Sequence, residues 1–166
     1  MRYVTCVLVG FGLAVLAAAG SASAASLRIS DAWIRSAPPG AQVMGGFATL
    51  VNEGETPVTV QAVQSDAFGR VEIHETTTEA GVSKMRELPR LALEPGATVR
   101  LEPGGKHLML MQPRRGIAAG ERVEVVFQLG DGSRVEAPFE VRAADAMDAG
   151  HAGHHGHTDH SGHGHD

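Results

Sequence analysis

Residues 107–111 read His-Leu-Met-Leu-Met, and this short stretch carries the pattern that decides the fold. Side chains that alternate in character along the chain are typical of a β-strand, because successive residues of a strand point to opposite faces. The two leucines share one face and are predicted to pack the core. The other face then carries His107, Met109 and Met111. A strand buried on both faces, with the methionines filling gaps, is the alternative.

Similar short runs extend on both sides of this stretch. They are rich in Val, Leu, Ile and Thr, and turn residues interrupt them about every 8 to 12 residues, as in β-sandwiches and barrels. Pro-Gly and Asp-Gly pairs supply the turns. The sequence therefore predicts an all-β domain without an amphipathic helix. Strands are expected at 27–35, 43–52, 56–63, 70–76, 83–88, 98–102, 107–111, 122–129 and 134–142.

Length and composition narrow the functional classes. The chain has 166 residues, which predicts one folded domain. It carries 14 Lys and Arg against 19 Asp and Glu, a net charge of -5, and no basic run that could neutralise nucleic-acid phosphates. The motifs of nucleophilic hydrolases, phosphate-binding loops and zinc proteases are not found in it. A binding protein is therefore expected rather than an enzyme.

Residues 1–24 have the pattern of a secretory signal peptide. Arg2 precedes an apolar run that is slightly short of the roughly 20 residues needed to span a bilayer. Small residues follow this run, so cleavage after Ala24 is predicted, with an uncleaved anchor as the alternative. The only cysteine, Cys6, lies in this leader. The exported protein is therefore expected to have no thiol for a disulfide or a metal site.

Two residues of the 107–111 strand could bind a metal together. His107 and Met109 point the same way and lie roughly 6 to 7 Å apart, so an imidazole and a thioether can converge on one ion. A thioether is a soft, neutral donor that suits Cu(I) and offers little to Zn, Mg or Ca. Alternation also puts His74 on one face with Glu72. Taken alone, His74 would more often be an ordinary surface histidine.

The spacing of four residues resembles the ligand motif of a known family. His74, Met85, His107 and Met109 are separated by ten, twenty-one and one residues. This order matches the H-x10-M-x21-H-x-M motif of the PCu(A)C family of periplasmic copper chaperones. The resemblance extends over almost all of the domain predicted at 25–142. It includes the words Arg-Val-Glu-Ile-His-Glu-Thr around His74 and Pro-Gly-Gly-Lys-His-Leu-Met-Leu-Met around His107.

The resemblance implies a Greek-key, cupredoxin-like β-sandwich or barrel with one Cu(I) at an exposed site, held by those four residues. It also implies delivery of copper to the CuA centre of cytochrome c oxidase, beside Sco-type thiol proteins. A blue-copper electron carrier is not expected, because that site needs a cysteine thiolate. Met111 could be an accessory or exchange donor, and Met44 could be core. The aromatic residues assigned to packing are Trp33, Phe47, Phe127 and Phe139.

Residues 143–166 differ sharply in composition from the rest of the chain. They hold seven of the nine histidines, five Gly and four Asp, and neither Lys nor Arg. This composition predicts a disordered segment that gathers metal, with imidazoles and carboxylates that suit Cu(II) better than Cu(I). An expression tag is the alternative. The histidines that could bind there are His151, His154, His155, His157, His160, His163 and His165.

Two other functions remain open on the sequence alone. In a periplasmic metal buffer or copper resistance protein, the histidine-rich segment would be the primary metal site and the methionine site would only store copper. An immunoglobulin-like adhesion or assembly module would use the methionines as core. The copper chaperone is the preferred hypothesis, because it explains both the spacing of the four residues and the histidine-rich segment.

Overall fold

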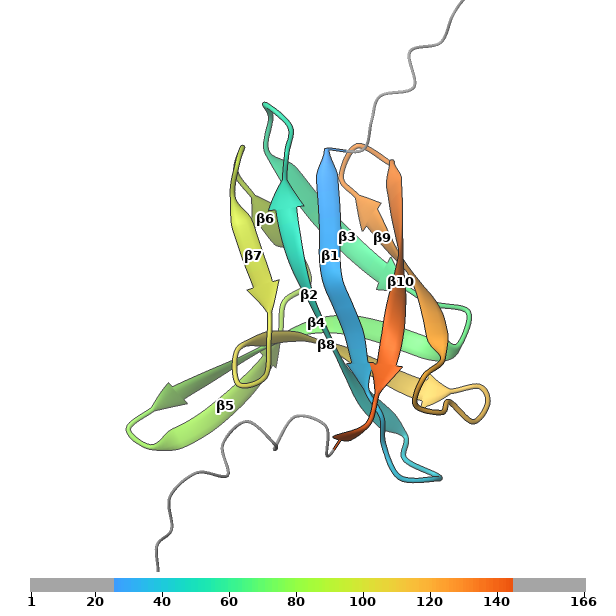
Figure 1. Cartoon of the computed structure of the whole chain (residues 1–166). Coiled ribbons are helices and arrows are strands. Elements are labelled where there is room, and N and C mark those ends of the chain that lie inside the picture. The colour runs from blue at the N-terminus through green and yellow to red at the C-terminus, as the bar shows by residue number, and fades with distance from the viewer. Residues whose placement is uncertain (1–25, 145–166) are drawn as a thin grey trace, which may run out of the picture.

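The computed structural model describes residues 26–144, which form ten strands of one continuous sheet (Figure 1). Neighbouring strands follow the order β5-β4-β8-β2-β1-β10-β9-β3-β6, and β7 pairs with β2. A further pairing of β3 with β4 closes seven of these strands into a barrel. The strands are β1 (Leu27–Arg35), β2 (Val43–Asn52), β3 (Val58–Gln64), β4 (Phe68–Glu79), β5 (Val82–Glu87), β6 (Leu91–Leu93), β7 (Thr98–Leu101), β8 (Lys106–Pro113), β9 (Arg122–Leu129) and β10 (Arg134–Arg142).

The predicted all-β fold is confirmed, and β1, β2, β9 and β10 have the predicted bounds. One strand was missed. β6 has only three residues, Leu-Ala-Leu, which is too short for alternation to show in the sequence. It exists because it pairs with β3 and buries both of its leucines. The predicted signal peptide and the seven C-terminal histidines lie outside the described residues.

Apolar side chains of the seven barrel strands fill the barrel interior. Leu108 and Leu110 of β8 are fully buried there, and so are Phe127 and Phe139, as predicted. β2 passes very close to β8 at Gly46, where a Cβ would lie 2.7 Å from Cδ1 of Leu110. The leucines of the 107–111 stretch therefore face the core, and its other side chains face outward.

A second, smaller apolar contact lies on the outside of the barrel. Trp33 of β1 pairs with Phe47 of β2, and their ring centroids are 4.4 Å apart. The guanidinium groups of Arg35 and Arg142 lie 5.9 and 5.6 Å from the centroid of the Trp33 ring, a distance at which cations and rings attract. Both rings are almost completely buried. The packing role predicted for Trp33 and Phe47 is confirmed.

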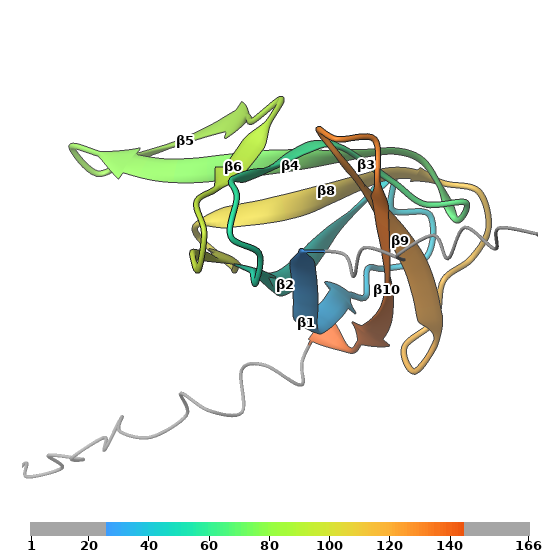
Figure 2. The ribbon, with the colours of Figure 1, turned by 90° about the horizontal axis from the view of Figure 1, so that it is seen from above.

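The β4–β5 hairpin extends beyond the barrel as an arm (Figure 2). Its tip is the pair Ala80 and Gly81, both with positive φ (49° and 79°), as a tight hairpin turn requires. All six residues of β5 are exposed. The arm therefore carries its side chains away from the core.

No helix within residues 26–144 is long and apolar enough to cross a membrane.

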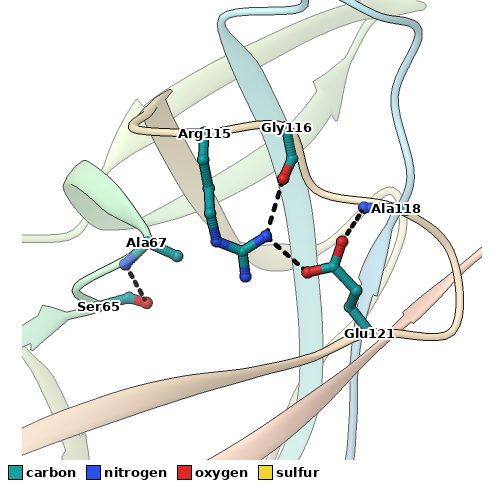
Figure 3. A network of polar contacts seen from close by, with 6 residues as sticks. All are labelled: Ser65, Ala67, Arg115, Gly116, Ala118 and Glu121. Carbon is teal, nitrogen blue, oxygen red and sulfur yellow. Dashed lines mark hydrogen bonds and ion pairs between the residues drawn. The ribbon is translucent and has the colours of Figure 1, made fainter.

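The C-terminal end of β8, at Pro113, leads into a loop that is fixed by polar contacts (Figure 3). Arg115 donates to the carbonyl oxygen of Gly116 and to the carboxylate of Glu121, at 2.8 and 2.6 Å. The N–H of Ala118 donates to the same carboxylate at 2.7 Å. These contacts, first from Ala118 and then from Arg115, lower the pKa of Glu121 below its usual value. These contacts fix the loop at the end of β8 that is opposite the arm.

Asn52 is the one buried polar side chain among residues 26–144. Its Nδ2 donates to the carbonyl oxygens of Thr56 and Leu93, at 2.8 and 3.0 Å. Its Oδ1 accepts from the N–H of Gly54 at 3.0 Å. A single side chain therefore joins the turn after β2 to the short strand β6.

Replacing Asn52 with Ala is expected to lower the free energy of unfolding by about 1–3 kcal/mol, because buried carbonyl groups lose their donor. Urea denaturation of the two proteins measures this difference. The control is Gln61→Ala on the exposed side of β3, which should change stability little. Equal losses in the two variants would contradict the role given to Asn52.

Candidate metal centre

Strands β4 and β8 run antiparallel and bring three of the predicted ligands, His74, His107 and Met109, onto one outer face, the side that points away from the barrel interior. Residues that lie directly opposite each other in such a pair project to the same face. Their neighbours Ile73 and Leu108 are buried in the core. The pairs on the outer face are His74 with His107, Glu72 with Met109, and Arg70 with Met111.

The two imidazoles lie at a separation that suits one shared ion. The ring centroids of His74 and His107 are 6.1 Å apart, and the ring planes are inclined by 46°. A metal–imidazole bond of about 2 Å puts the metal roughly 3 Å from each ring centre, so two rings on one ion lie at most about 6 Å apart. The observed separation equals this upper limit, which corresponds to a nearly linear nitrogen–metal–nitrogen arrangement, and a bent arrangement requires the rings to move closer together.

Each imidazole has one nitrogen in a hydrogen bond. Nε2 of His74 donates to Oε2 of Glu72 at 2.8 Å, since a carboxylate can only accept. Nδ1 of His107 donates to the carbonyl oxygen of Gly105 at 3.1 Å. Nδ1 of His74 is buried and has no hydrogen-bond partner within residues 26–144. An orphaned imidazole nitrogen beside a second histidine fits a metal ligand.

The two predicted methionine ligands lie on opposite sides of His74. Met109 is half-buried and faces Glu72, diagonally across from His74. Met85 pairs with Thr76 on the arm, also diagonal to His74 but towards the tip. Its side chain is 56% exposed. The structure therefore brings His74, His107 and Met109 together at adjoining positions and puts Met85 at the rim, with neither sulfur in the barrel interior.

The other two methionines, Met111 and Met44, lie on opposite faces of the sheet. Met111 shares the outer face, opposite Arg70, one step further from the histidines than Met109. Met44 is buried and pairs with Leu110, so it belongs to the core. Of the two, only Met111 lies on the outer face with the histidines.

An ion-pair cluster ties the arm to β8 next to His74. The carboxylate of Glu75 bonds Nζ of Lys106 at 2.8 Å and Nη2 of Arg86 at 2.6 Å. These bonds, first from Lys106 and then from Arg86, lower the pKa of Glu75 below its usual value. Because Glu75 directly follows His74 in β4, the cluster holds three strands in place around the candidate site.

Two features of the site were not assigned from the sequence. Alternation predicts Glu72 on the face of His74 but not its hydrogen bond to that ring. Phe47 is predicted to pack away from the motif. Its ring covers Gly45, where a Cβ would lie 3.2 Å from the Phe47 Cζ, and Gly45 is the β2 partner of Met109. Both contacts join residues two apart on one strand, so alternation places each pair on one face, but the contact itself depends on the rotamer of one side chain.

Comparison with known sequences gives one family model and two curated relatives. The model, described as "Putative lipoprotein LpqE-like", matches residues 27–141. "Putative lipoprotein Lxx21020" of Leifsonia xyli is 32% identical over 108 residues, 64% of each chain. "Uncharacterized protein RP573" of Rickettsia prowazekii is 30% identical over 89 residues, 53% of this chain and 49% of that one. The chain thus matches about half to two thirds of these relatives' length.

Solved structures share the fold at low sequence identity. The apo PCuAC domain of PmoF2 is 24% identical with a TM-score of 0.62, covering 74% of this chain and 94% of that one. The copper-bound form of that domain is 22% identical with a TM-score of 0.60, and the match covers 71% of this chain and 93% of that one. Cu(I)-DR1885 from Deinococcus radiodurans is 23% identical with a TM-score of 0.59, and the match covers 75% of this chain and 83% of that one. The predicted cupredoxin-like barrel is confirmed.

The match of the family model spans nearly the whole described barrel, including all four residues of the predicted ligand motif. The chain therefore belongs to the LpqE-like family, which is the PCu(A)C family that its sequence motif indicated.

Proposed function

We propose that this protein is an exported, periplasmic copper chaperone that carries Cu(I) on His74, Met85, His107 and Met109. The observation that carries the proposal is the pair of outward-facing imidazoles, 6.1 Å apart, with the Met109 thioether at the adjoining position. Solved PCuAC domains described as copper-bound and as Cu(I)-loaded support copper as the metal.

The donor chemistry favours Cu(I) and reversible binding. Two neutral imidazoles and two thioethers would leave the bound ion with one positive charge, and the thioethers need no deprotonation to bind. The half-exposed Met85 lies on the arm, where another protein can approach it. A site of this kind suits transport of the ion rather than catalysis.

The preferred recipient is the CuA centre of cytochrome c oxidase, with Sco-type thiol proteins as further partners. This part of the proposal rests on the family resemblance. The second candidate function is copper storage or resistance, which would use the same ligands and retain the ion.

Replacing Met109 with Leu keeps the side-chain volume but removes the sulfur, and should weaken Cu(I) binding about tenfold or more, or ~1.4 kcal/mol. Titration against a competing Cu(I) chelator under reducing conditions measures the affinity. The parent protein should bind one equivalent at this site. Met44→Leu makes the same change in the core and should leave the affinity unchanged. Loss of binding in Met44→Leu but not in Met109→Leu would refute the assigned site.

Mixing the Cu(I)-loaded protein with an apo CuA domain should move copper to that domain, because Met85 at the rim of the site is exposed and can be replaced by a ligand of the recipient. Separation of the two proteins, followed by measurement of copper in each, tests this. Copper that stays with the loaded protein would favour storage over delivery.

The C-terminal histidines are proposed to gather Cu(II) and to raise its local concentration near the barrel by tethering. A chain that ends at Ala144 should therefore bind less Cu(II) in equilibrium dialysis and should still bind one Cu(I). An unchanged number of bound Cu(II) ions would exclude this role for the segment.

A further inference from the structure

Glu72 is an unusually enclosed carboxylate on the outer face of β4. Its side chain is only 11% exposed, and it lies between two partners on its own strand. One oxygen forms an ion pair with Arg70, and the other accepts the bond from Nε2 of His74. Across the strand pair it faces Met109. Oε1 is buried and has no hydrogen-bond partner within residues 26–144, so the bond from His74 to Oε2 is the contact through which Glu72 can fix the orientation of the ring.

The hydrogen bonds decide which nitrogen of each ring carries the proton. A carboxylate and a backbone carbonyl both accept, so the bonded nitrogens must be Nε2 of His74 and Nδ1 of His107. A neutral imidazole has one N–H and one lone pair. The lone pairs are therefore on Nδ1 of His74, which is buried without a partner among residues 26–144, and on Nε2 of His107.

We propose that Glu72 is a positioning residue of the copper site. By accepting the Nε2 proton it holds His74 in the tautomer that offers Nδ1 to the metal, while the Gly105 carbonyl holds His107 in the tautomer that offers Nε2. The inference rests on the proposed copper function and adds to it the donor atoms and the group that sets one of them. A bond to the non-coordinating N–H of a ligand histidine fixes the ring and raises its basicity.

Glu87 supplies a matched comparison. It pairs with His74 from the other side, on β5, and therefore also faces the ring. Its side chain is exposed, and His74 bonds Glu72 instead. Two carboxylates thus flank one imidazole, and only the enclosed one is bonded to it. Glu72 and Glu87 both place a negative charge near His74, but only Glu72 forms a hydrogen bond with it. Comparing a variant of each residue therefore distinguishes the effect of charge from that of the hydrogen bond.

The metal-free protein tests the tautomer directly. Long-range proton–nitrogen NMR of the full 15N-labelled chain, at about pH 8, above the reference value of a free imidazole, identifies the protonated nitrogen of each ring. A His74→Gln variant assigns the signals. The parent, Glu72→Gln and Glu87→Gln should all show His74 protonated at Nε2, since the amide oxygen of Gln still accepts. Glu72→Leu should show a mixture of tautomers. A His74 tautomer that is unchanged in Glu72→Leu would overturn the inference.

Addition of one equivalent of Cu(I) tests the donor atoms. The nitrogen signals that move should be Nδ1 of His74 and Nε2 of His107. Cu(I) affinity should fall about 10- to 100-fold in Glu72→Leu, less in Glu72→Gln, and not in Glu87→Gln. Coordination through Nε2 of His74 would overturn the inference and leave the copper function standing. A parent protein that binds no Cu(I) at either histidine would overturn the proposed function and the donor-atom assignment together, whereas the tautomer experiment would still decide the Glu72 contact.

Discussion

The register between β4 and β8 sets the geometry on which the candidate site depends. Because His74 lies opposite His107, Ile73 lies opposite Leu108 and Val71 opposite Leu110 on the inner face. A slip of β8 by one residue would turn His107 into the core and its two leucines into solvent. Burial of each leucine stabilises the fold by about 1.5–3 kcal/mol. Packing inside the barrel therefore holds the metal-binding face outside it in register.

Alternation of side chains predicted most of the fold, because it reflects a local property of a strand. Four strands have their predicted bounds, and the outward placement of Met109 followed from the two buried leucines beside it. β6 could not be found in this way. Its three residues are a strand only because β3 and Asn52 provide bonding partners from distant parts of the chain. Strand order and closure of the barrel are likewise properties of the pairing.

The candidate site was also predictable only in part. The spacing motif identified the ligand residues, and the alternation of side chains along each strand indicated part of the face that they share. Which of them touch was not evident. The half-exposed place of Met85 on the arm, the contact of Glu72 with His74 and the cover of Phe47 over Gly45 all arise between residues on different strands or from the rotamer of one side chain. Propensity and spacing carry no information on such contacts.

The packed pair on the outside of the barrel has an optical consequence. Trp33 is the chain's single tryptophan, so its indole emission comes from one ring. That ring packs at a tilt against Phe47, which covers the β2 partner of Met109. The fluorophore thus lies two strands from the candidate metal centre, on the same side of the sheet. The intrinsic fluorescence of the unlabelled protein offers a native signal for events at that surface.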